Sequence, residues 1–113
     1  MISETAHISP DGTLQFLVIR TPDGDITMGF SDYPWHTHGD VQAAVRNSSE
    51  SPEAAAERFV DELLSNKLVI AISIVAGTIR DIWIADDPEA NRKWCQDGET
   101  IEFRLWDGTK VDV

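Results

Sequence analysis

Two neighbouring stretches near the start of the chain, at residues 14–21 and 26–30, show the period of two of a strand: Leu14, Phe16 and Val18 point one way and Gln15, Leu17 and Ile19 the other, and Ile26, Met28 and Phe30 alternate with Thr27, Gly29 and Ser31. Such alternation is typical of strands with one buried face. The residues between them, 21–24, read Thr-Pro-Asp-Gly, which places proline and glycine where a β-turn favours them. The pattern therefore predicts a β-hairpin. Gly29 lies inside the second strand and indicates a bulge or the close approach of another backbone segment.

Helical spacing replaces this alternation at residues 52–65. Ser51 is a favourable N-cap residue, and Pro52 occupies the first helical position, where its missing N–H costs little. The expected buried face consists of apolar residues three and four apart: Ala56, Phe59, Val60, Leu63 and Leu64. A shorter helical segment, residues 41–46, is expected after Asp40, which is an acceptable N-cap.

Strand signals dominate the rest of the chain. Residues 67–76 are apolar on both faces, as in a central strand. The other expected elements are a short strand at 5–8, a long strand at 79–86, a short helical or irregular segment at 87–95, a strand at 100–106 and a returning strand at 110–113. We therefore predict an α+β fold, with one twisted antiparallel sheet of about five to seven strands and the helix at 52–65 packed on one face. Trp83 and Trp106 are expected to line the other face.

The length of 113 residues is typical of one domain, so we expect a single α+β domain over residues 1–113. The one cysteine, Cys95, excludes an intrachain disulfide and fits a reducing compartment. Residues 1–12 lack the basic and apolar segments of a signal peptide. The longest apolar run, at residues 68–77, is too short to span a bilayer. We therefore expect a soluble cytoplasmic protein.

Charge is the strongest global feature of the sequence. Twenty acidic residues against nine basic ones give a formal net charge of −11. The resulting field repels nucleic acids and anionic membranes, so we expect neither as a direct partner. The same field accelerates encounter with a basic protein, although a role in solubility alone also accounts for an acidic composition.

An acidic ridge on the helix at 52–65 is a candidate partner-binding surface. Glu53, Glu57 and Asp61 lie four residues apart, on one outward side of the helix. Trp35 is added to the candidate contacts because tryptophan is enriched at the centres of protein interfaces. The alternative is a solvated helix face without a partner. A further hypothesis is a homodimer that forms through edge strands or a bare sheet face.

The segment Trp-His-Thr-His-Gly-Asp at residues 35–40 is the candidate chemical site. In an extended chain His36, His38 and Asp40 project to one side and offer ligands that suit zinc or another divalent metal. The alternative is a structural loop, in which the histidines bond to the backbone and Trp35 fills the core.

Other catalytic chemistry finds little support in the sequence. The chain lacks the nucleophile elbow of hydrolases, the glycine-rich phosphate loops and the His-Glu-x-x-His zinc motif. Cys95 follows Trp94 and is expected to be a spectator. His7, the remaining histidine, lies far from His36 and His38 in the sequence, so no second cluster of possible metal ligands is apparent. Residues 32–39, which contain the two histidines, are expected to leave the sheet. A non-enzymatic protein is therefore favoured, with no cofactor apart from the candidate metal.

Residues 21–40 also carry a family resemblance. The segment resembles a pattern in small bacterial proteins of the polymorphic-toxin immunity type, where a hairpin with a Gly-x-[Ile/Val]-Thr-x-Gly-Phe motif precedes a His-x-His loop. The matching positions are Gly24, Asp25, Ile26, Thr27, Gly29, Phe30, His36 and His38. The resemblance implies a non-enzymatic protein that binds and neutralises a toxin from the same genome. Many such toxins are basic nucleases, which agrees with the acidic composition.

Overall fold

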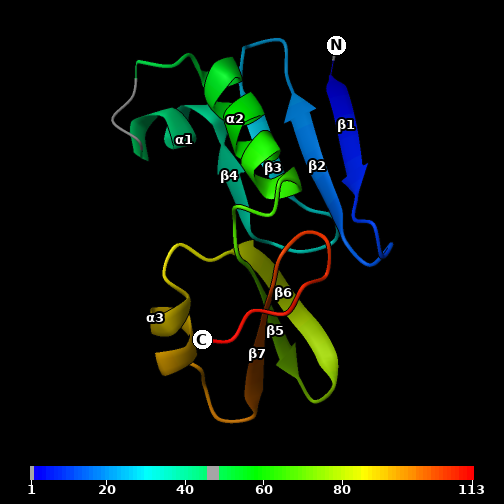
Figure 1. Cartoon of the computed structure of the whole chain (residues 1–113). Helices are drawn as coiled ribbons and strands as arrows, with labels where there is room; N and C mark the ends of the chain where they lie inside the picture. Colours follow the sequence, from blue (N-terminus) through cyan, green and yellow to red (C-terminus); the bar gives the residue numbers. More distant parts are fainter. Residues whose placement is uncertain (1, 46–48) are drawn as a thin grey trace.

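Two antiparallel sheets and three helices make up the fold of residues 2–45 and 49–113, the parts of the chain that the computed structural model describes. In chain order the elements are β1 (Ser3–Ile8), β2 (Gln15–Arg20), β3 (Ile26–Phe30), β4 (His36–His38), α1 (Gly39–Val45), α2 (Pro52–Leu64), β5 (Ile70–Val75), β6 (Thr78–Ile84), α3 (Pro88–Lys93) and β7 (Glu99–Arg104). The first sheet has the order β1-β2-β3-β4 and the second β6-β5-β7. Figure 1 shows the first sheet with α1 and α2 at one end of the molecule and the second sheet with α3 at the other. No helix within these described ranges is long and apolar enough to cross a membrane.

The α+β class is confirmed, but the strands are divided between two sheets where the sequence suggested one. Strand β5 explains the division, because it lies between β6 and β7 and has both of its faces covered. Ile70 and Ile72 point into the main core, which the two sheets share. Ala71 points the other way, into a second cluster with Ala85 and Phe103. A strand that is apolar on both faces therefore became the centre of a sheet of its own.

The predicted hairpin is confirmed as β2 and β3. Phe16 lies opposite Phe30, and Val18 lies opposite Met28. All four side chains are buried, whereas the alternating positions on the other face are only half-buried or exposed. The period of two in the sequence therefore identified both strands and the sets of residues that share a face, and the structure shows that Phe16, Val18, Met28 and Phe30 form the inward set.

Gly29 permits the close backbone approach that the sequence indicated. A Cβ atom at this position would lie 2.7 Å from the carbonyl oxygen of Trp35. That approach allows residues 36–38 to pair with β3, with His36 opposite Gly29 and His38 opposite Thr27. The expectation that residues 32–39 leave the sheet is therefore wrong for this part, which returns as the edge strand β4.

Helix α2 begins as predicted, since the Ser51 hydroxyl accepts a hydrogen bond from the Ala54 N–H at 3.1 Å. Its buried residues are Ala55, Ala56, Phe59 and Leu63. Leu64 was expected on this face but is 37% exposed. Helix α1 begins at Gly39, one residue before the expected cap, and Asp40 lies inside it. The predicted end of that segment, Arg46, lies outside the described residues.

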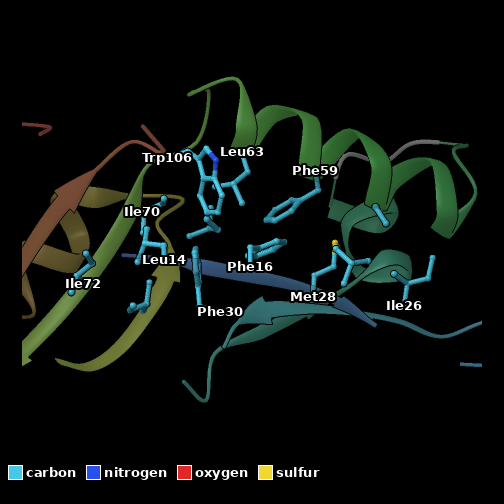
Figure 2. Close-up of a cluster of buried hydrophobic side chains, with 14 residues drawn as sticks. Leu14, Phe16, Ile26, Met28, Phe30, Phe59, Leu63, Ile70, Ile72 and Trp106 are labelled. Atoms are coloured by element: carbon cyan, nitrogen blue, oxygen red, sulfur yellow. The ribbon is translucent and has the colours of Figure 1, made fainter. Parts of the chain in front are cut away.

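The main core lies between α2 and the inner face of the first sheet, and it continues into the second sheet (Figure 2). The rings of Phe16 and Phe59 stack with centroids 6.1 Å apart and join β2 to α2. Trp106 is buried in this core, although it was expected on the opposite face. Trp83 is half-buried and packs against the second cluster instead.

The outer face of the first sheet has no helix over it, because α1 and α2 lie together on the inner side (Figure 1). The strand register places Ala6, Leu17, Gly29 and His36 in one row across this face. Glu4, Ile19, Thr27 and His38 form the next row. The register thus defines an outer face with Leu17 and Ile19 at its centre and with both histidines of β4 at one edge.

An ion pair connects the end of the second sheet to the β1–β2 turn. The Arg104 guanidinium donates to an Asp11 carboxylate oxygen at 2.9 Å and to the Thr13 hydroxyl at 2.9 Å. It also donates to the Trp106 carbonyl at 2.9 Å. Arg104, together with the hydroxyls of Ser9 and Thr13, holds the pKa of Asp11 well below its usual range.

Acidification is expected to destabilise the fold through Asp11. Because its pKa is lower in the folded state, the unfolded chain binds more protons in the interval between the two values, and stability rises with pH there. The contribution is complete above about pH 4 and is lost as the pH falls toward the folded value. Urea unfolding at a series of pH values should show a smaller acid dependence for Asp11→Asn than for the wild type. Glu89→Gln, which alters an exposed carboxylate of α3, should keep the wild-type profile, and equal profiles for all three proteins would contradict the assignment.

Candidate functional site

The two histidines of the candidate chemical site lie side by side on the outer face of the first sheet. Their ring centroids are 5.2 Å apart and the rings are nearly perpendicular. The Nδ1 atom of His38 lies 3.2 Å from an Asp25 carboxylate oxygen and 3.3 Å from the Thr27 hydroxyl. The Nδ1 atom of His36 lies 3.1 Å from the Pro34 carbonyl oxygen. Each imidazole therefore already has a local polar contact.

The structure does not bring Asp40 to these histidines as a third ligand. The Asp40 carboxylate accepts a hydrogen bond from the Val41 N–H at 2.9 Å, in the first turn of α1. Within residues 2–45 and 49–113, no group of three or more histidine, cysteine, aspartate or glutamate side chains is arranged to hold a metal ion. The contact of His36 with Pro34 is of the kind that the structural alternative expected.

The acidic ridge of α2 is divided by an ion pair that the sequence did not indicate. The Arg20 guanidinium donates to both carboxylate oxygens of Glu53, at 2.8 to 3.1 Å. This pairing raises the pKa of Arg20, and the charge of Glu57 adds to the effect. Glu57 and Asp61 are exposed and make no ion pair in the described part of the chain. The ridge therefore presents two free carboxylates and one that is already bonded.

Glu57 and Asp61 line an open groove between α2 and the edge of the first sheet, which we call the α2–β1 groove. Its volume is about 340 Å³. It is lined by Thr5 and His7 from β1, Val18 and Arg20 from β2, and Ala56, Glu57, Val60 and Asp61 from α2. The apolar residues come from the inner side of β2 and from the helix surface beside it. Val18 and Ala56 are almost fully buried beneath the groove, so its accessible lining combines the half-buried Val60 with the carboxylates of the helical wall and with His7 and Arg20 on the strands.

His7 is the member of this groove that sequence reasoning missed. It is remote from the α2 acids in the sequence, and only the β1–β2 register places it beside them. In that register His7 pairs with Phe16 and Thr5 with Val18, so both β1 side chains lie on the face that α2 covers. The alternation of side chains along β1 shows that Thr5 and His7 share one face of the strand. It does not show which strand β1 pairs with, and that pairing is what places both residues beside α2.

Trp35 lies apart from the acidic groove. It is half-buried against the main core, with its ring centroid 6.3 Å from that of Phe30. It precedes β4, at the edge of the first sheet opposite to β1. The most exposed tryptophan is Trp94, at 76%, and the Lys93 ammonium lies 5.8 Å from its ring centroid. The structure therefore does not group Trp35 with the acidic ridge.

Cys95 has the surroundings of an unreactive thiol. Its S–H donates to the Glu99 carbonyl at 2.9 Å. Burial and the nearby Glu99 carboxylate raise the pKa of the Cys95 thiol. Because the thiolate is the nucleophilic form, a raised pKa lowers the reactivity of cysteine at neutral pH.

No family model matches this chain, and neither a curated protein nor a solved structure has significant similarity to it.

Proposed function

We propose that this protein is a non-enzymatic binding protein and that it holds a basic protein partner in the α2–β1 groove. The observation that carries the proposal is the groove's composition. Glu57 and Asp61 are exposed, make no ion pair in the described part of the chain, and lie beside Val60, which is half-buried. A lysine or arginine side chain of a partner would place its charged end against the carboxylates and its methylene stem against Val60.

Charge and apolar contact have separate roles in this interaction. The formal net charge of −11 attracts a basic partner over a distance and raises the rate of encounter. The half-buried Val60 then supplies an apolar contact that does not depend on salt. The Arg20–Glu53 ion pair closes one end of the acidic row, so the free carboxylates lie nearer the C-terminal half of α2. Binding should therefore weaken with salt without being abolished.

An immunity-like role is the specific form of this proposal. The resemblance of residues 21–40 to immunity proteins supports it, as does the acidic composition that suits a basic toxin. In that role the chain would act by occupying a basic surface of the toxin, with no chemical step. The α2–β1 groove would supply the contact, and the segment that carries the resemblance would build the sheet beneath it.

Neutralising the two free carboxylates is expected to weaken partner capture about tenfold or more. The variant is Glu57→Gln/Asp61→Asn, which keeps side-chain volume and removes two charges. The charge-matched control is Asp86→Asn/Glu89→Gln, which removes two exposed charges near α3. Each tagged protein is incubated with lysate of its own source, washed at low and high salt, and the retained proteins are quantified by mass spectrometry. Loss of two close charge pairs at about 1 kcal/mol each accounts for the expected factor.

The result that supports the proposal is one basic protein retained at low salt by the wild type and the control but not by the groove variant. Equal retention by all three proteins would place the contact elsewhere. Absence of any retained basic protein would contradict the proposed function.

A further inference from the structure

Strand β1 is an edge strand with little of the usual protection against further pairing, since Glu4 is its one acidic residue. Its outer side faces no other strand in the described part of the chain. The segment contains no proline, no lysine and no bulge, the features with which proteins commonly protect edges. Ile2 and Ile8, at its two ends, are 67% and 64% exposed. A regular edge with an exposed isoleucine at each end is suited to receive another strand.

The free hydrogen-bonding groups of this edge can be assigned from the register. The Ser9 N–H donates to the Leu14 carbonyl, so this pair is bonded across the β1–β2 ladder. In an antiparallel ladder bonded positions alternate, which makes Ser3, Thr5 and His7 the residues that bond to β2. The N–H and C=O groups of the intervening residues, Glu4, Ala6 and Ile8, therefore point outward.

We infer that β1 pairs with β1 of a second copy of this chain, antiparallel and with Thr5 opposite Thr5 on the two-fold axis. This register places Ile2 of each copy opposite Ile8 of the other. It brings the outward groups of Glu4 opposite those of Ala6, so both strands present bonding groups at matching positions. The two four-stranded sheets then form one continuous sheet, and their outer faces lie on the same side.

The sequence of the strand favours a second copy as the occupant. The two exposed isoleucines are equidistant from Thr5, so a two-fold axis at that residue covers both of them at once. Thr5 would meet Thr5, a favourable cross-strand pair. Glu4 is the acidic residue of β1, and in this register it faces Ala6 instead of a second carboxylate. Self-pairing therefore needs no complementary partner sequence.

The expected effect of salt distinguishes this inference from the proposed function. Two copies with a formal charge of −11 repel each other, so added salt should strengthen self-association. Binding of a basic partner should weaken under the same conditions. The inference rests on the outward backbone groups of β1 and not on the carboxylates of the groove, although the Thr5 side chain also lines that groove.

Solution mass and one edge substitution test the pairing. For the untagged protein, the solution mass of the wild type should rise from that of one chain, 12.6 kDa, toward twice that value as concentration and salt are raised. Ala6→Pro removes an outward N–H that bonds to nothing within the sheet, so it should keep the fold and abolish the rise. Ala6→Ser, the matched control, should behave as the wild type. A wild type that stays monomeric throughout, or a dimer that Ala6→Pro leaves intact, overturns the inference.

Disulfide trapping tests the register even if Ala6→Pro does not fold. In a Cys95→Ser background, Thr5→Cys places two thiols on the two-fold axis, at a Cα separation of about 4.5 Å that a disulfide spans. Ser3→Cys places them about 13 Å apart, because each residue of a strand adds about 3.3 Å. Mild oxidation should therefore give a covalent dimer with Thr5→Cys and not with Ser3→Cys. Equal trapping of both, or of neither, contradicts the proposed register.

Discussion

Replacing Phe16 by alanine is expected to remove about 3–5 kcal/mol from the free energy of unfolding. The side chain is fully buried and its ring contacts both the sheet and the helix above it. Its centroid lies 5.1 Å from that of Phe30 and 6.1 Å from that of Phe59. Truncation would leave a cavity where β2, β3 and α2 meet, and such a loss is a large part of the stability of a domain of this size. Chemical denaturation, followed by tryptophan fluorescence, measures the change.

The adjacent residue, Leu17, provides the matched control. It lies on the same strand but points to the outer face of the sheet, where no helix covers it. Leu17→Ala should therefore cost about 1 kcal/mol or less, because less apolar surface is buried there. A similar loss for both substitutions would mean that the outer face is covered as well as the inner one. That result would contradict the one-sided packing on which the groove and the free β1 edge both depend.

Local signals in the sequence predicted most of the elements. The hairpin and the start of α2 depend on turn residues, an N-cap and short-range periodicity, all of which lie within a few residues of each other. The division into two sheets depends on which strands pair, and strands of similar composition give no local signal for that choice. The edge strand β4 was missed for a related reason. Gly29 indicated a close approach, but the approaching segment, Trp35 and His36, could be identified only in three dimensions.

For the acidic ridge of α2, the sequence predicted which residues share a side of the helix but not which residues contact them. Helical spacing correctly placed Glu53, Glu57 and Asp61 on one outward side of α2. It could not show that Arg20, distant in the sequence, bonds to Glu53 and leaves the other two free. It also could not bring His7 into the same groove. Spacing along one element determines which side chains share a face, whereas the partners across that face depend on tertiary packing.

Substituting Gly29 by alanine is expected to destabilise the protein by about 1–3 kcal/mol and to displace β4. The added Cβ would lie 2.7 Å from the Trp35 carbonyl oxygen and 3.3 Å from the Cβ of His36. Because the closer contact is with backbone, a side-chain rotation cannot relieve it. The edge strand has only three residues, so moving away from β3 is its simplest response. Both histidines should then lose their present surroundings.

Denaturation and histidine NMR together test this prediction. For Gly29→Ala, the imidazole signals of His36 and His38 should shift while that of His7, on the other edge strand, stays in place. Ser31→Ala alters the next position on the same side of the chain without adding a Cβ, so it should leave both stability and the three signals nearly unchanged. If Gly29→Ala keeps wild-type stability and wild-type signals, the close approach of Trp35 does not determine the position of β4. The pairing of residues 36–38 with β3 would then need another cause, such as the burial of Thr37 and its hydrogen bond from the Gln42 side chain of α1.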